Sequence, residues 1–323
     1  MKDRFGREIT YMRISVTDRC NLHCRYCMPE SIPRLPAADI LTFEEIRDVA
    51  AAAAELGITD VRITGGEPLM RKGCPELIAM LKAIPGIRHV ALTTNGILLG
   101  ENLPAFLAAG LDSVNISLDS LDDRTYQKIT GSGRLSEVLD SIRLAEEAGL
   151  PVKLNVVLQE GINEEQWPQL AELAKDHRLD VRFIEMMPIG FGKHYRCVSN
   201  DDLLAQMKKR WPSMKEDPSR HGSGPARYVK MPGWRGSIGF ISAIHGKFCG
   251  TCNRLRLTAG GKLKPCLCYG ETIDLMPALR DTEERIEALK EAICRAVSAK
   301  PEAHCFEHTQ EITEKSEMIQ IGG

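Results

Sequence analysis

The chain has 323 residues, and 43% of them are apolar, so it can form one large domain or a domain of about 200 residues with a smaller one beside it. The formal net charge of -2 and the mixing of acidic with basic residues argue against bulk binding of nucleic acid. Neither a signal-peptide core nor about 18 uncharged apolar residues in a row can be found, so we expect a cytoplasmic protein with no membrane partner.

Six short β-rich runs alternate with helical patterns between residue 11 and about residue 187. The runs are YMRISV, DVRIT, HVALTT, SVNISL, VKLNVVL and DVRFIEM. After the first run, Thr42 and Glu45 predict a capping box at the start of a helix that ends at Gly57. The repeated order of strand, loop and helix predicts a parallel sheet, either a barrel or a doubly wound open sheet.

Unusual segments fall where the predicted strands end. They are the first cysteine loop, TGGEP at 64–68, TTNG at 93–96, SLDS at 117–120 and IEMMP at 184–188. A barrel gathers all strand ends around one mouth, whereas an open sheet gathers only those near its switch point. We therefore predict an α/β fold with a partial (β/α)6 TIM-type barrel in residues 1–190.

The pattern changes after about residue 190. SNDDLLAQMKKRW predicts a capped helix, a polar loop follows, and RYVKMPGWRGSIGFI predicts two strands around Pro232 and Gly233. A further helical pattern lies near 282–298. We expect residues 191–323 to form an α+β extension that closes the barrel.

Three thiols crowd the first predicted loop, at Cys20, Cys24 and Cys27. A 4Fe-4S cluster has four irons, each of which takes a ligand from outside the cluster, so three thiolates leave one iron open. A zinc site completed by His23, or ordinary buried thiols, are the alternatives. Eleven cysteines in a chain of this size suit metal ligation in a reducing compartment better than a disulfide scaffold.

A second group of three thiols lies at Cys249, Cys252 and Cys266. It also fits a cubane with one open iron, although Cys268 could complete a zinc site instead. If the KPCLC segment is extended, the Cys268 side chain points away from that of Cys266. We interpret Cys268 as a neighbour and not a ligand.

The first loop, with Tyr26 before its last thiol, and the GGEP segment at 65–68 resemble the radical S-adenosylmethionine superfamily. That resemblance implies that S-adenosylmethionine chelates the open iron and is cleaved to a 5'-deoxyadenosyl radical. It also places cofactor contacts at Tyr26, Gly66, Ser117 and Met187. Because Gly66 has no side chain, we expect it to let the backbone approach the methionine amine.

The segments RISVTDRCNLHCRYCMP, FCGTCNRLRLTAGGKLKPCL and the terminal IGG are similar to the GTP 3',8-cyclase family of molybdenum cofactor biosynthesis. The resemblance implies a lyase with two 4Fe-4S clusters, the second of which binds the guanine of GTP. The implied product is 3',8-cyclo-7,8-dihydro-GTP, and the implied partners are an external electron donor and a downstream cyclic pyranopterin monophosphate synthase. A homodimer is a possibility that the sequence leaves open. The implied GTP contacts are Arg13, Arg62, Thr93, Lys153, Arg254, Leu255 and Arg256.

Basic residues interrupt four of the predicted strands. They are Arg13, Arg62, Lys153 and Arg182. Each could pair with a carboxylate or extend to solvent, but four cations facing one lumen would form a well suited to a triphosphate. We also expect Arg254 and Arg256 to be catalytic residues. The resemblance implies the same for the tail glycines Gly322 and Gly323, although the tail could instead be a frayed terminus.

The remaining candidates receive structural interpretations. We expect packed or idle thiols at Cys74, Cys197, Cys294 and Cys305, a solvated helix end at His304 and His308, and turn or cap roles for Asp119 and Asp122. Two features depart from the family pattern. The region 190–225 is short, and HGKFC stands before the second cysteine group, where the family more usually has a segment that contains serine. Another radical enzyme with an auxiliary cluster, such as a peptide modifier, and a non-enzymatic iron-sulfur electron carrier are the rival functions.

Overall fold

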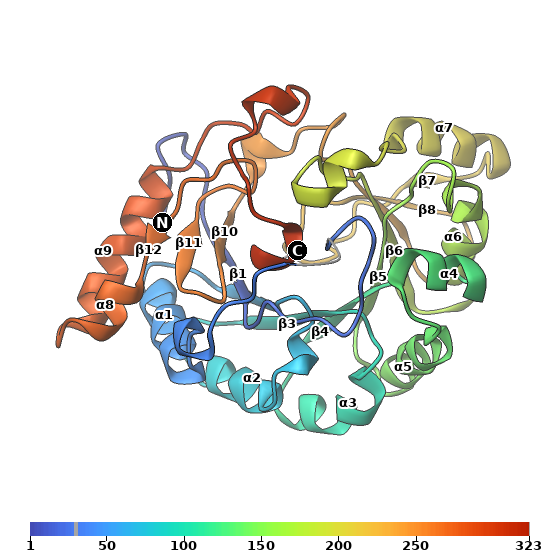
Figure 1. Ribbon diagram of the computed structural model, residues 1–323. Helices are drawn as coiled ribbons and strands as arrows, with labels where there is room; N and C mark the ends of the chain where they lie inside the picture. Colours follow the sequence, from blue (N-terminus) through green and yellow to red (C-terminus); the bar gives the residue numbers. More distant parts are fainter. Residues whose placement is uncertain (29–31, 323) are drawn as a thin grey trace.

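The computed structural model describes residues 1–28 and 32–322, and Figure 1 shows a curved sheet with helices along its outer side. Six parallel strands form the middle of the sheet in chain order. They are β1 (Tyr11–Ser15), β2 (Asp60–Thr64), β3 (His89–Thr94), β4 (Ser113–Ser117), β5 (Val152–Val156) and β6 (Leu179–Ile184). Each lies within, or within one residue of, a predicted β-rich run, so the partial barrel is confirmed.

Helices follow the strands and cover the outer face of the sheet (Figure 1). They are α1 (Phe43–Glu55), α2 (Cys74–Lys82), α3 (Leu99–Ala108), α4 (Asp123–Thr130), α5 (Leu135–Glu147) and α6 (Trp167–Asp176). The capping box is present, because Thr42 Oγ1 accepts from the Glu45 amide at 3.1 Å and Glu45 Oε2 accepts from the Thr42 amide at 2.8 Å. Gly57 follows the helix with a φ of 99°, which a glycine adopts without strain.

The C-terminal part of the chain extends this sheet at both edges. Beside β1 the order is β10 (Arg254–Leu257), β11 (Lys262–Lys264) and β12 (Ile273–Asp274); beside β6 it is β9 (Ile238–Ile241), β8 (Arg227–Lys230) and β7 (Lys215–Glu216). Strand β10 is parallel to β1, and β9 is parallel to β6. The predicted pair of strands around Pro232 and Gly233 is β8 and β9. The sequence pattern missed β10 to β12, and it missed β7, which lies in the segment predicted as a polar loop.

Three further helices accompany these strands: α7 (Asn200–Arg210), α8 (Met276–Arg280) and α9 (Arg285–Ser298). Ser199 caps α7 by accepting from two amides of its first turn. Short 3-10 helices lie next to the sites described below, at Pro68–Met70, Gly190–His194, Cys249–Thr251 and Met318–Gln320. In the part of the chain that the structure describes, every helix is too short or too polar to cross a membrane.

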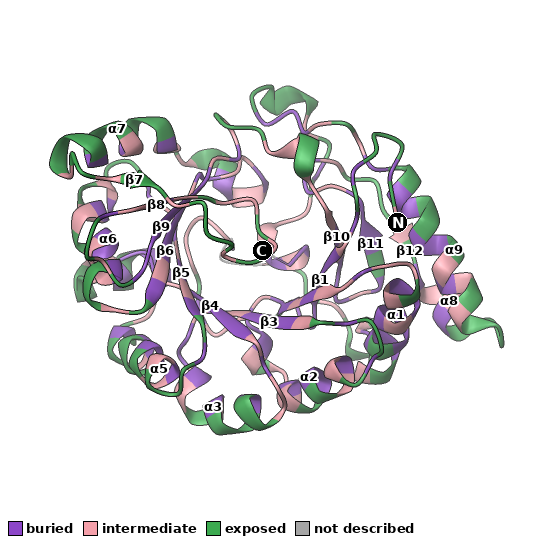
Figure 2. Ribbon diagram, turned by 180° about the vertical axis from the view of Figure 1, so that it is seen from behind, coloured by how far each residue is buried: buried purple, intermediate pink, exposed green. Residues whose placement is uncertain are grey.

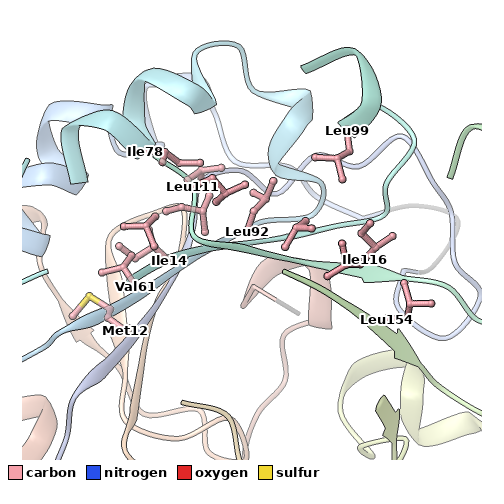
Figure 3. Packing of buried hydrophobic residues seen from close by; sticks show 14 of the residues in the cluster. Met12, Ile14, Val61, Ile78, Leu92, Leu99, Leu111, Ile116 and Leu154 are labelled. Atoms are coloured by element: carbon pink, nitrogen blue, oxygen red, sulfur yellow. The ribbon is translucent and has the colours of Figure 1, made fainter. Parts of the chain in front are cut away.

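The hydrophobic core lies between the sheet and the outer helices, where Met12, Ile14, Val61, Leu92 and Leu154 pack together (Figure 3). Purple, buried segments follow the strands in Figure 2, and green, exposed ones follow the outer helix surfaces. Successive side chains of a strand point to opposite faces of the sheet. The residues between these apolar ones therefore face the lumen of the barrel.

Candidate active site

The first cysteine loop is held by the segment that follows β2. The Gly66 amide donates to Thr17 O at 2.7 Å, and the Glu67 amide donates to Arg19 O at 2.7 Å. A Cβ on Gly66 would lie 2.4 Å from Arg19 O. The cysteine loop therefore occupies the space that a side chain at position 66 would need. This contact explains why residue 66 is a glycine, without the expected approach to a methionine amine.

Glu67 is a buried carboxylate that sequence reasoning did not single out, although the GGEP segment contains it. It accepts from Thr94 Oγ1 at 2.8 Å and from the Asn95 amide at 2.7 Å. Asn95 in turn donates to Asn21 Oδ1 in the cysteine loop at 2.8 Å. Burial raises the pKa of Glu67 to about 7, against the lowering effect of these hydrogen bonds. Glu67 therefore ties the ends of β2 and β3 to the cysteine loop.

Asp119 links the cysteine loop to the ends of β4 and β5. Tyr26 donates its hydroxyl to Asp119 Oδ2 at 2.8 Å, and the Val157 amide donates to Asp119 Oδ1 at 2.8 Å. Burial raises the pKa of Asp119 to about 6. The predicted turn or cap role does not fully describe Asp119, because its carboxylate bridges three segments. Asp122 does cap α4, because it accepts from the Thr125 amide at 2.8 Å.

A cavity of about 250 Å³ opens inside the barrel beside this loop. Its lining includes ten of the predicted site residues: Cys20, Cys24, Cys27, Tyr26, Gly66, Ser117, Met187, Thr93, Arg13 and Arg256. All four predicted S-adenosylmethionine contacts thus share one cavity with the three thiols, although they come from the ends of different strands. A barrel produces this grouping because its strand ends meet at one mouth.

The donor set of the first loop fits a 4Fe-4S cluster. Cys20, Cys24 and Cys27 are free thiols that lie on one cavity wall. Among the described residues, no three His, Cys, Asp or Glu side chains converge as they would around a single metal ion. Cubane ligands bind different irons and need no such common point. Burial raises the pKa of Cys27 to about 12, so iron binding must displace a proton there.

Arginines from three neighbouring strands lie side by side in the lumen. Arg13 is in register with Arg62 on β2 and with Arg256 on β10. Burial, followed by the nearby Arg256, holds the pKa of Arg13 well below its usual range. Burial and then Arg254 lower the pKa of Arg256 to about 10. Three guanidinium groups on adjacent strands make this part of the lumen positive, which would favour an anionic ligand.

Lys153 and Arg182 continue this positive surface on β5 and β6. Arg182 Nη2 donates to Asn155 Oδ1 at 2.5 Å, and Lys153 Nζ donates to His221 O. Neither of these acceptors carries a charge that would neutralise the cation. Burial and then Arg182 lower the pKa of Lys153 to about 8.

Leu255 is separated from the other predicted GTP contacts. Its side chain is fully buried in the hydrophobic core, because the alternation along β10 turns it away from Arg254 and Arg256. The prediction of a Leu255 contact therefore fails for the side chain.

The two cysteine groups lie at opposite ends of one pair of strands. The first loop follows the carboxyl end of β1, whereas Cys249 and Cys252 precede the amino end of β10. Because β1 and β10 are parallel, the groups are separated by the length of a strand. Five residues of strand span about 16 Å. The lumen arginines lie between the two groups.

Lys300, which the sequence did not reveal as a site residue, supports the second cysteine group. Its buried ammonium donates to Arg254 O and to Pro265 O, both at 2.8 Å. Burial raises the pKa of Cys252, but Arg254 and Lys300 outweigh it and lower the value to about 7. Arg254 also stacks on the Phe248 ring, with 4.8 Å from Cζ to the ring centroid.

Cys268 contacts a different thiol from those of the second group. Its Sγ atom lies 3.3 Å from Cys305 Sγ, and both residues are buried.

The prediction that His304 lies at a solvated helix end was wrong. His304 lies in a loop after α9, is only 6% exposed and stacks on Phe306. Cys74 is packed and its thiol donates to Pro68 O, and Cys294 is exposed, so both agree with the prediction of packed or idle thiols.

We expect Cys268→Ser to bind as much iron as the unsubstituted protein, because the Cys268 sulfur contacts Cys305 Sγ at 3.3 Å. Iron and sulfide analysis of the reconstituted variant measures this, with Cys266→Ser as the matched control that should lose cluster iron. Equal iron loss in both variants would make Cys268 a ligand.

The C-terminal tail enters the barrel, and Figure 1 places the end of the chain in the middle of the curved sheet. Ile319 and Ile321 are buried, so the described part of the tail is not a frayed terminus. Gly322 O accepts from Arg256 Nη1 at 3.1 Å. A Cβ on Gly322, whose φ is 75°, would lie 3.0 Å from Thr64 Oγ1. Gly323 lies outside the described residues.

Comparison with known proteins agrees with the barrel and its cysteine loop. Residues 14–174 match the Radical SAM superfamily, and residues 179–306 match the family described as Molybdenum Cofactor Synthesis C. Streptococcus suis SuiB bound to S-adenosylmethionine has a similar fold, with a TM-score of 0.66 and 11% identity over 97% of this chain and 77% of that one. A structure of anSMEcpe with bound AdoMet gives a TM-score of 0.58 and 16% identity over 91% and 92%.

The fold and the three-cysteine loop thus define a radical S-adenosylmethionine enzyme, a class that uses a 4Fe-4S cluster and S-adenosylmethionine. GTP 3',8-cyclases from Alkaliphilus oremlandii and Heliobacterium modesticaldum are 45% and 46% identical to this chain, each over the full length of both proteins. The chain belongs to the GTP 3',8-cyclase family. Membership favours the enzyme interpretation over an iron-sulfur electron carrier.

Proposed function

We propose that this protein converts GTP to 3',8-cyclo-7,8-dihydro-GTP, with residues 1–190 generating the radical and residues 191–323 binding the base. The observation that carries the proposal is the parallel pairing of β1 with β10, which sets two three-cysteine groups at opposite ends of an arginine-lined lumen. A nucleotide between them would lie within reach of both.

The first cluster, held by Cys20, Cys24 and Cys27, would supply electrons that cleave S-adenosylmethionine to a 5'-deoxyadenosyl radical. Tyr26, Gly66, Ser117 and Met187 would hold the cofactor in the cavity that they line. Glu67 and Asp119 fix the strand ends around that cavity and so keep the reacting groups in position.

At the other end, Cys249, Cys252 and Cys266 would hold a second 4Fe-4S cluster whose open iron binds guanine. Arg254 lies beside this group, and Arg13 and Arg256 lie next along the lumen. Their guanidinium groups would bind phosphate or ribose oxygens and neutralise the substrate's charge. An external electron donor and an enzyme that consumes the cyclised nucleotide complete the proposal.

The direct test is anaerobic reconstitution with iron and sulfide, followed by incubation with GTP, S-adenosylmethionine and a strong reductant. We expect 5'-deoxyadenosine and cyclised GTP together, detected by liquid chromatography and mass spectrometry. Formation of 5'-deoxyadenosine without any GTP-derived product would contradict the assignment of the substrate.

Arg254→Ala and Lys153→Ala should each weaken GTP binding, because each removes a charge-assisted contact of about 1.5 to 3 kcal/mol, or about 10- to 150-fold in Kd. Binding of S-adenosylmethionine should change little. Calorimetry on the reconstituted variants measures both. Arg143→Ala is the control, because Arg143 pairs with Glu147 on the exposed face of α5. Unchanged GTP affinity in both lumen variants would contradict the proposal that the basic residues of the lumen bind the triphosphate.

A further inference from the structure

The segment between β9 and β10, residues 242–253, runs from one flank of the six central strands to the other; we call it the crossing loop. Strand β9 lies beside β6, and β10 lies beside β1. The crossing loop carries Cys249 and Cys252 of the second cysteine group. The position of this loop therefore decides where the second group stands relative to the first one, which follows β1.

Glu185 holds the start of the crossing loop. It follows β6 directly, and its side chain is fully buried. Its Oε2 accepts from the amides of Ile244 at 2.7 Å and His245 at 3.1 Å, and its Oε1 accepts from His245 Nδ1 at 2.9 Å. The amide of Asn200, the first residue of α7, also donates to Oε1, at 3.1 Å. A buried carboxylate that loses such donors is costly, so the loop is held firmly to the end of β6.

The same carboxylate borders the proposed cofactor cavity, because Glu185 and Met187 both line it. Met187, Ile244 and Phe248 pack against one small hydrophobic cluster, so the crossing loop shares its packing with the cavity wall. The Arg254 guanidinium lies over the ring of Phe248. A shift of the loop would therefore move the second cysteine group and Arg254 relative to the cofactor cavity.

We propose that Glu185 and His245 are positioning residues that set the distance between S-adenosylmethionine and the nucleotide at the second cysteine group. The inference rests on the proposed function and deepens it, because neither residue needs to touch the reacting atoms. A displacement of about 1 Å at a reacting group can cost on the order of a hundredfold in rate. A 5'-deoxyadenosyl radical that misses the ribose takes its hydrogen atom from a buffer thiol, which becomes a thiyl radical. It then gives 5'-deoxyadenosine without cyclised GTP.

His245 is the position to test, because its side chain is 45% exposed and can be replaced without opening the core. His245→Ala removes the Nδ1 donor, whereas His245→Asn offers a side-chain N–H close to the position of Nδ1. In the reconstituted holoprotein with a thiol in the buffer, we expect His245→Ala to lower the cyclised GTP formed per 5'-deoxyadenosine at least about tenfold. His245→Asn should restore most of this ratio. Liquid chromatography and mass spectrometry of one anaerobic reaction measure both products.

A second readout is independent of activity. The backbone amides of the crossing loop should exchange with deuterium faster in His245→Ala than in the wild type, because the loop has lost one of its bonds to Glu185. In His245→Asn they should exchange like the wild type. Mass spectrometry of peptic peptides from the reconstituted proteins measures the rates.

The matched control is His177→Ala. His177 Nδ1 also lies 2.8 Å from a carboxylate, that of Glu146, and its side chain is likewise 45% exposed, but it follows α6 on the outside of the barrel. This variant should keep the wild-type product ratio. If His245→Ala does not retain both clusters, His245→Gln, whose longer amide removes the donor from the Nδ1 position, decides by the same ratio.

Three outcomes would overturn the positioning role: a wild-type ratio in His245→Ala, equal loss of both products, or a folded His245→Asn that recovers nothing. A wild-type protein that forms 5'-deoxyadenosine but no cyclised GTP would instead overturn the proposed function.

Discussion

Replacing Cys24 with Ala should abolish the formation of 5'-deoxyadenosine. Cys24 lies on the cavity wall with Cys20 and Cys27, and the loop offers only these three thiols. Without one of them the cluster loses a thiolate, and its open iron can no longer be held against the cofactor site that we propose at Tyr26 and Gly66. Iron analysis and chromatographic detection of 5'-deoxyadenosine after anaerobic reduction measure the effect, which we expect to be complete.

Cys252→Ala is the matched control, because it removes a thiol from the other end of the lumen. It should still cleave S-adenosylmethionine, although slowly, but should form no cyclised GTP. The pairing of β1 with β10 separates the two groups by the length of a strand, so damage to one should leave the other intact. Equal loss of cleavage in both variants would contradict this division of labour.

Deletion of Gly322 and Gly323 should leave both clusters and S-adenosylmethionine cleavage intact while greatly reducing the yield of cyclised GTP. Gly322 O accepts from Arg256 Nη1, and a Cβ on Gly322 would lie only 3.0 Å from Thr64 Oγ1 and 3.1 Å from Ser15 Cβ. The deletion frees Arg256 to move. A displacement of about 1 Å at a reacting group can cost on the order of a hundredfold in rate.

Both products are measured from the same anaerobic reaction, so that loss of cyclisation is separated from loss of radical formation. Lys315→Ala is the control, because Lys315 lies in the same tail but is exposed. It should give the wild-type yield of both products. A truncated protein with the wild-type yield of cyclised GTP would show that the tail only packs in the barrel.

The sequence by itself determined the features that depend on local spacing. Short β-rich runs between helical patterns predicted β1 to β6, and Thr42 with Glu45 predicted the start of α1. The three-thiol loop after β1 was visible because its cysteines are neighbours in the chain. Such signals survive in sequence because neighbouring residues form the structure concerned.

Only the tertiary structure decided what depends on distant segments. It paired β10 with β1, which set the two cysteine groups at opposite ends of the lumen, and it turned Leu255 into the core. It brought Lys300 to Cys252 and His221 to Lys153, contacts between residues far apart in sequence. Strand pairing and loop closure arise from the packing of the whole chain, so no local pattern of residues encodes them.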